Sequence, residues 1–158
     1  MNARSYTRSI EIGALPAKVF HALTGEVDQW WTTSAGDASV VGAKPIFRFG
    51  KSYQAMLVKE LVPERRVVWE CLEQNHANKT LSVHDEWVGT TLVWEIEPTP
   101  KASRLTFVHQ GLVPQLECYE ICEAGWDHYV ESLKSYLETG TGDPYQHRGK
   151  RGPATVRS

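Results

Sequence analysis

The chain has 158 residues, and its 17 lysines and arginines nearly balance 19 aspartates and glutamates, for a formal net charge of −2. A chain of this length buries most of its apolar surface around one core, so we expect one domain. The charge balance argues against a surface built to hold nucleic acid or an anionic membrane. No apolar stretch approaches the roughly 20 residues of a membrane helix, which argues against a membrane protein.

The C-terminal end of the chain differs in composition from its body. Residues 143–158 carry four basic residues and one acidic residue, together with glycine and proline, so we predict a domain at 1–142 and a disordered basic tail at 143–158. The three cysteines are too few and odd in number for a secreted disulfide framework, and no apolar run follows the first residues. We therefore expect a cytoplasmic protein.

The first half of the sequence predicts a strand, a short helix and then more strands. Residues 5–12 alternate polar and apolar positions, which indicates a strand. A short helix is expected from Pro16 to Gly25, because proline suits the first turn and glycine the end. Five strand-like runs separated by turn residues follow at 44–50, 52–61, 64–73, 86–98 and 103–111. Gly89 is out of step with its run and indicates a bulge or a close backbone approach.

The last element is a long amphipathic helix, predicted from Gln115 to Thr139. Its apolar face recurs at steps of three and four residues: Tyr119, Cys122, Trp126, Tyr129, Leu133 and Tyr136. Pro114 suits its start and Gly140 its stop. Gly125 inside the helix costs about 1 kcal/mol against alanine, so we expect it to serve a bend or a close contact with the sheet.

This order of elements belongs to the α+β class, with one antiparallel sheet that the terminal helix must cover. A helix about 10–12 Å wide cannot fill a broad concave sheet. A sheet that curls around this helix therefore leaves room for a cavity.

Four segments together resemble a known superfamily: SIEIGALPAKVFHALT (9–24), DQWW (28–31), residues 87–112 and residues 118–144. They resemble the helix-grip, START-like superfamily (SRPBCC), and within it the proteins similar to the activator of Hsp90 ATPase. The resemblance implies a six-stranded curved antiparallel sheet, two short helices between strands 1 and 2, and a long C-terminal helix over an apolar cavity. It also implies that residues 28–31 lie at the cavity mouth. The loop at 74–85 and the basic tail do not match.

Aromatic residues gather on the predicted inward positions of the sheet and the terminal helix. Core packing is the simpler explanation for any one of them, but as a set they favour a cavity with apolar walls and a few polar groups. The candidate ligand-binding residues are Trp30, Trp31, Phe47, Phe49, Trp69, Trp87, Trp94, Phe107, His109, Tyr119, Cys122 and Trp126. Of the tandem Trp30 and Trp31, we expect one to pack against the terminal helix and the other to line or close the entrance.

The histidines and cysteines do not indicate a catalytic or metal site. His109 is expected to be a buried, hydrogen-bonded group or a ligand contact, and His128 a surface residue, because neither has a nucleophile or carboxylate partner by spacing. Cys118 and Cys122 could join His109 around zinc, but no further ligands follow, so we expect no metal and no cofactor. Phosphate-binding and nucleophile-elbow motifs are missing from the sequence.

Three functions therefore remain open. The first is binding of a small apolar, aromatic or lipid-like ligand in the cavity. The second is a cyclase, dehydratase or hydrolase on the same cavity, with His109 and Tyr119 as the first candidates for acid and base; no catalytic residue can be assigned. The third is a chaperone-associated or stress-response protein acting through its outer surface, and a homodimer or a chaperone are the protein partners to be considered.

Overall fold

The computed structural model describes residues 4–145, which form one antiparallel sheet and three helices. The helices are α1 (Pro16–Gly25), α2 (Val27–Trp30) and α3 (Tyr119–Thr139). The strands are β1 (Tyr6–Ile12), β2 (Thr33–Ala35), β3 (Ile46–Phe49), β4 (Ser52–Val62), β5 (Arg66–Asn75), β6 (Thr91–Thr99) and β7 (Ala102–Gln110). Their order across the sheet is β1-β7-β6-β5-β4-β3-β2, with every neighbouring pair antiparallel.

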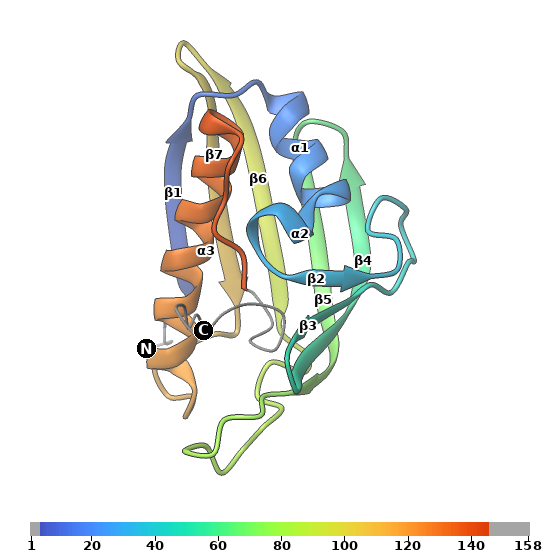
Figure 1. The fold of residues 1–158 in the computed structure, drawn as a ribbon, viewed down its shortest axis with the longest axis vertical. Helices are drawn as coiled ribbons and strands as arrows, with labels where there is room; N and C mark the ends of the chain where they lie inside the picture. The colour runs from blue at the N-terminus through green and yellow to red at the C-terminus, as the bar shows by residue number, and fades with distance from the viewer. Residues whose placement is uncertain (1–3, 146–158) are drawn as a thin grey trace.

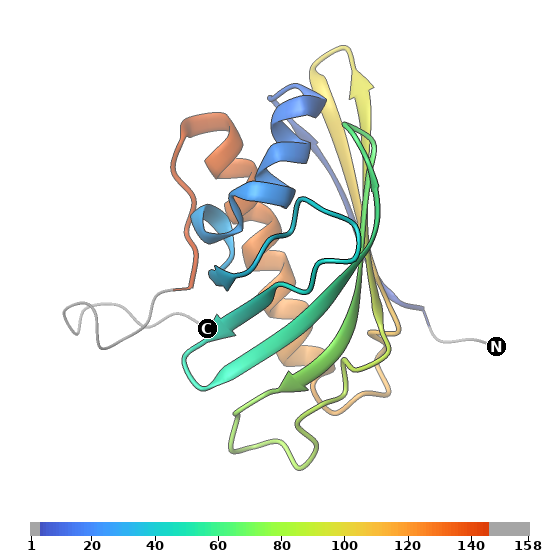
Figure 2. The ribbon, with the colours of Figure 1, turned by 90° about the vertical axis from the view of Figure 1, so that its right-hand side faces the viewer.

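The sheet is one curved layer, and all three helices lie on its concave side (Figures 1 and 2). The two short helices follow β1, and α3 crosses the sheet as the predicted terminal helix. This confirms the helix-grip α+β fold. The sheet has seven strands where six were expected, because the short edge strand β2 pairs with β3. All three β2 residues are exposed, so no apolar alternation marks this strand in the sequence.

Two elements start more than two residues away from their predicted positions. β6 begins at Thr91, because the preceding residues form a turn in which Gly89 adopts a left-handed φ of 88°. α3 begins at Tyr119 rather than Gln115, after a short turn. Its predicted end is confirmed: Gly140 is left-handed and its N–H donates to the Tyr136 carbonyl at 2.8 Å.

The core is dominated by aromatic rings that the alternating strand positions and the inner face of α3 bring together. Trp31 lies among them, with its ring centroid 5.0 Å from that of Trp126 and 4.8 Å from that of Phe47. Trp94 stacks on Phe107 at 3.9 Å. Burying several such rings supplies much of the hydrophobic stabilisation of a domain of this size.

The chain after α3 turns back along the helix and packs against the core. The Asp143 N–H donates to Ser132 Oγ at 2.6 Å, and the Tyr145 N–H donates to the Trp31 carbonyl at 2.7 Å. The first residues of the predicted disordered tail are therefore ordered, since these contacts fix their backbone. The rest of that tail, 146–158, lies outside the described residues. Among the described helices, none combines the length and the apolar character needed to cross a membrane.

Candidate functional site

A pocket of about 770 Å³ lies between the ends of β3, β4 and β5 and the first half of α3. Its volume falls in the range of about 300–1,000 Å³ that small-molecule sites occupy. Its walls are mostly aromatic and apolar, with a few polar groups, and its rim includes exposed residues such as Ala77 and Ile121. A depression of similar volume at the far end of β6 and β7 is lined mainly by charged and proline residues, and no residue that lines it is aromatic. We therefore take the aromatic pocket as the candidate site.

The structure divides the predicted ligand-binding residues into pocket, core and surface. Five line the pocket: Trp31, Phe49, Trp87, Cys122 and Trp126. Six are fully buried in the core behind it: Trp30, Phe47, Trp69, Trp94, Phe107 and His109. Tyr119 lies outside the pocket and directs its hydroxyl to Glu123. The alternation along the strands and helix identified the buried residues. It could not distinguish residues of the pocket wall from residues of the solid core.

The tandem tryptophans do not form a lid. Trp30 is 0% exposed and Trp31 is 1% exposed, and their rings stack with centroids 6.0 Å apart. The Trp30 indole N–H donates to the Ala22 carbonyl at 2.9 Å, which holds it under α1. Trp31 packs on Trp126 of α3 and lines the pocket from inside. The alternative that one tryptophan closes the entrance is therefore wrong, because both rings are buried.

His109 is a buried polar group whose hydrogen bonds are satisfied. The Trp126 indole N–H donates to its Nδ1 at 3.1 Å, so Nδ1 carries no proton. In the neutral ring Nε2 then carries the proton and donates to Thr90 Oγ1 at 2.8 Å, while the Thr90 hydroxyl donates to the Trp87 carbonyl at 2.6 Å. Burial lowers the pKa of His109 to about 3. The prediction of a satisfied buried histidine is confirmed.

Gln54 is a pocket residue that the sequence reasoning missed. It lies opposite Gln74 across β4 and β5, and both side chains are buried at the pocket wall. The Gln74 amide oxygen accepts the Trp87 backbone N–H at 2.8 Å, whereas the Gln54 oxygen has no partner among the described residues. The sequence did contain a signal for it: Gln54 is a polar residue on the inward face of β4, where the next inward residues are Met56 and Val58.

Gly125 of α3 faces the pocket. A Cβ added at this residue would meet no atom within 4 Å, so the glycine is not required for close contact with the sheet. That alternative in the sequence prediction is wrong. A larger side chain here would instead project into the space at the pocket wall.

Comparison with known proteins fixes the family of the chain. The family model described as Activator of Hsp90 ATPase homolog 1-like protein matches residues 14–138. The chain belongs to this family. No curated protein matches the sequence significantly. The family assignment agrees with the helix-grip fold and with the resemblance found in the sequence.

Solved structures similar to this family member share its fold. The Aha1 dimer from Colwellia psychrerythraea is 28% identical, with 90% of this chain and 100% of that chain covered and a TM-score of 0.72. The protein MLL2253 from Mesorhizobium loti is 21% identical, with 85% and 96% covered and a TM-score of 0.70. DynU16, from the dynemicin biosynthetic locus, is 21% identical, with 89% of this chain and 49% of that chain covered and a TM-score of 0.69. At 21% identity, the last two likenesses concern the fold alone.

This family member also brings together His76, Cys118 and Cys122 beside the pocket. One ligand atom from each lies within 4.8 Å of the other two. His109 was the histidine considered with these cysteines from the sequence, but both nitrogens of its ring are engaged by Trp126 and Thr90. The histidine that lies near the two cysteines is His76, in the loop that follows β5, for which the resemblance supplied no match.

The two thiols of this cluster differ in their tendency to ionise. A hydrogen bond from the Cys118 thiol lowers the pKa of Cys122, and the Trp87 indole N–H, 3.3 Å from its Sγ, acts in the same direction. The same bond to Cys122, together with burial, raises the pKa of Cys118. The third cysteine, Cys71, lies apart on β5, where burial raises its pKa to about 12. Of the three, Cys122 is the sulfur best prepared to carry negative charge.

Proposed function

We propose that the pocket binds a small molecule with an apolar or aromatic body and at least one N–H or O–H donor. The observation that carries the proposal is the Gln54 amide oxygen, which lies at the wall of an aromatic pocket in a side chain that is 5% exposed and has no partner among the described residues. Leaving a buried acceptor unpaired costs about 1–3 kcal/mol. A ligand donor at this oxygen would remove that cost, and the rings around it would stabilise the ligand body.

Binding is better supported for this pocket than catalysis by His109 or Tyr119. His109, the first candidate for a general base, uses both ring nitrogens in hydrogen bonds and is buried behind the wall. Tyr119, the second candidate, lies outside the pocket. A general base must reach the proton it removes, and neither side chain has access to a molecule in the pocket.

The test is a fluorescence titration with a flavonoid, an aromatic polyketide and a long-chain fatty acid. Trp31, Trp87 and Trp126 line the pocket, so a bound molecule should change the emission of the protein. The titrations are run with a metal chelator present, so that only the organic ligand is measured. Native mass spectrometry of the purified protein provides an independent view of any molecule that it carries.

Two pairs of variants make the titration specific. Gly125→Phe places a ring in the pocket and should abolish binding, whereas Glu120→Phe adds the same ring to an exposed position of α3 and should leave binding unchanged. Gln54→Leu should weaken binding of the best ligand about 10-fold, the value of one hydrogen bond of about 1.4 kcal/mol, while Gln110→Leu on the exposed side should not. Equal affinities in Gly125→Phe and the wild type would rule out this pocket as the binding site.

Association with a chaperone is a second candidate. It is supported by the family description and by the 28% identity over the full length of a protein named Aha1, whose solution structure is a dimer. Adding the purified protein to an Hsp90 and measuring ATP hydrolysis tests it directly. Sedimentation of the protein alone tests whether it also forms a homodimer. An unchanged ATPase rate and no co-sedimentation with the chaperone would exclude this function.

A further inference from the structure

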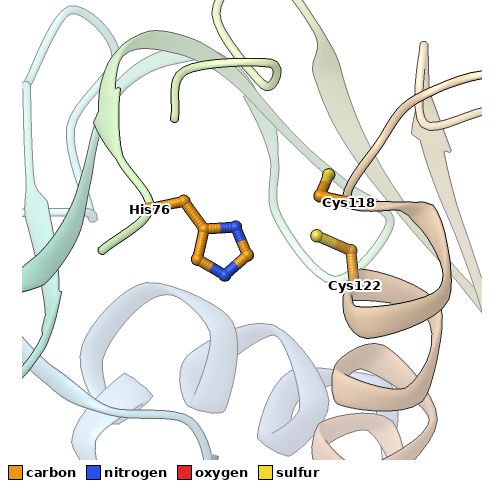
Figure 3. Close-up of side chains that lie close together, drawn as sticks. All are labelled: His76, Cys118 and Cys122. Carbon is orange, nitrogen blue, oxygen red and sulfur yellow. The ribbon is translucent and has the colours of Figure 1, made fainter. Parts of the chain in front are cut away.

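We propose that His76, Cys118 and Cys122 form a binding site for a thiophilic divalent cation of the Zn²⁺ class, with one coordination position open to the pocket. Figure 3 shows the imidazole of His76 directed toward the two sulfurs, which come from the start of α3. Two cysteine sulfurs and one imidazole nitrogen form a donor set that suits zinc. The site is independent of the proposed function, because it uses its own ligand atoms and does not require an organic molecule.

The three ligand atoms are already near the spacing that a metal needs. They lie within 4.8 Å of one another. Tetrahedral zinc with Zn–S bonds of about 2.3 Å holds two sulfurs about 3.8 Å apart. Closing the cluster around an ion therefore requires movements of no more than about 1 Å, which side-chain rotations can supply.

The backbone holds both parts of the site in place. His76 donates its N–H to the His84 carbonyl at 2.7 Å, and its own carbonyl accepts the Asn78 N–H at 2.8 Å. Cys118 and Cys122 are four residues apart on one turn, where the Cys122 N–H donates to the Cys118 carbonyl at 2.8 Å. This spacing places the two side chains on the same face of the helix.

Two carboxylates tie the loop that carries His76 to the turn that carries the cysteines. Glu86 accepts the N–H of Glu117 at 3.1 Å and that of Cys118 at 2.9 Å. Glu117 in return accepts the N–H groups of Ser82 and Val83, both at 2.9 Å. Each segment thus fixes the position of the other. This places ligands from distant parts of the sequence beside each other.

The surroundings of the sulfurs also suit a metal thiolate. The Trp87 indole N–H points at Cys122 Sγ, and such outer hydrogen bonds stabilise the charge on a coordinating sulfur. Both cysteines lie at the start of the 21-residue α3, where the helix dipole favours negative charge. On binding, each thiol loses one proton to solvent, so two protons are released and the charge of the cation is balanced by two thiolates.

The fourth coordination position gives the site a link to the pocket. His76 and Cys122 both line the pocket, so an ion between them would present its free position there. Zinc with three protein ligands usually holds water or an exchangeable molecule in the fourth position. A donor atom of a pocket ligand could therefore coordinate the ion directly.

Titration of the reduced protein with Co²⁺ tests the site. Bound Co²⁺ should produce sulfur-to-metal charge-transfer absorption with one equivalent per chain, and Zn²⁺ should displace it. Loss of an outer-shell group commonly costs about 10–100-fold in metal affinity, so loss of a ligand should cost more than about 100-fold. We expect this loss in Cys118→Ser, Cys122→Ser and His76→Ala.

Matched controls separate the site from general effects on folding. Cys71→Ser removes a buried cysteine outside the cluster, and His21→Gln removes an exposed histidine on α1; both should bind Co²⁺ as the wild type does. Circular dichroism reports whether each variant is folded. Absence of the charge-transfer band in the folded wild type, or equal binding in folded Cys122→Ser, would overturn the proposal and leave the organic ligand site untouched.

Discussion

Acidification should destabilise this fold through one buried side chain, His109. Its ring is neutral in the folded protein because Nδ1 accepts the Trp126 N–H and the side chain is fully buried, and burial lowers its pKa from 6.5 to about 3. In the unfolded chain the same ring takes up a proton near pH 6.5. Stability from this group is therefore complete above about pH 6.5 and is lost as the pH falls toward 3, by up to about 1.4 kcal/mol per pH unit.

The size of the effect follows from these two pKa values. Between about pH 7.5 and pH 4.5, preferential protonation of the unfolded chain at this one residue lowers the free energy of unfolding by about 2–3 kcal/mol. Protonation of carboxylates such as Glu117, whose pKa is lowered by backbone hydrogen bonds from Ser82 and Val83, also lowers the free energy of unfolding in acid. The variant His109→Gln retains an acceptor and a donor but does not titrate, so it removes only the histidine contribution.

The assay is urea unfolding of the wild type and His109→Gln at the two pH values. The variant should be less stable near neutral pH, because its side chain packs differently in the core. Its loss of stability on acidification should be smaller than that of the wild type by about 2–3 kcal/mol. If the free energies of unfolding of the two proteins fall by the same amount on acidification, the fold does not hold the histidine neutral.

Three further substitutions test the packing around α3 by urea unfolding. Gly142→Ala places a Cβ 2.5 Å from the Gln29 carbonyl oxygen and should cost about 1–3 kcal/mol; an unchanged midpoint would mean that this segment is not packed as described. Gly125→Ala meets open space and should gain about 0.5–1 kcal/mol of helix stability, so a loss would contradict the open position. Ser132→Ala removes the hydroxyl that donates to the Trp30 carbonyl at 2.7 Å and should cost about 1–3 kcal/mol; a neutral result would show that water replaces it.

Local patterns were sufficient to predict the longer elements and the α+β class. The helix face that contains Cys122, Trp126 and Tyr129 is buried as its spacing predicts, and the alternation that marks Trp94 and Phe107 places both rings in the core. These patterns depend on residues near one another in sequence. The exposed strand β2 has no such pattern, so it could be found only from its pairing with β3.

The site was less predictable because it depends on contacts between distant segments. His76 lies beside the two cysteines, and hydrogen bonds of Glu86 and Glu117 connect its loop to the turn before α3. No local periodicity encodes that connection. The division of the aromatic residues between pocket and core likewise depends on how far the sheet curls, which the order of polar and apolar residues does not specify.

The contact between the segment after α3 and the pocket has a practical consequence for protein production. Tyr145 lies on the pocket wall, its ring centroid 5.4 Å from that of Phe49, and its backbone is fixed to Trp31. A protein shortened at Gly140 would retain all of α3, but it would lose this wall and the backbone hydrogen bonds from Asp143 and Tyr145 to Ser132 and Trp31. A shortened protein made for ligand screening should therefore extend at least to Tyr145, because loss of the segment 141–145 would change binding and stability together.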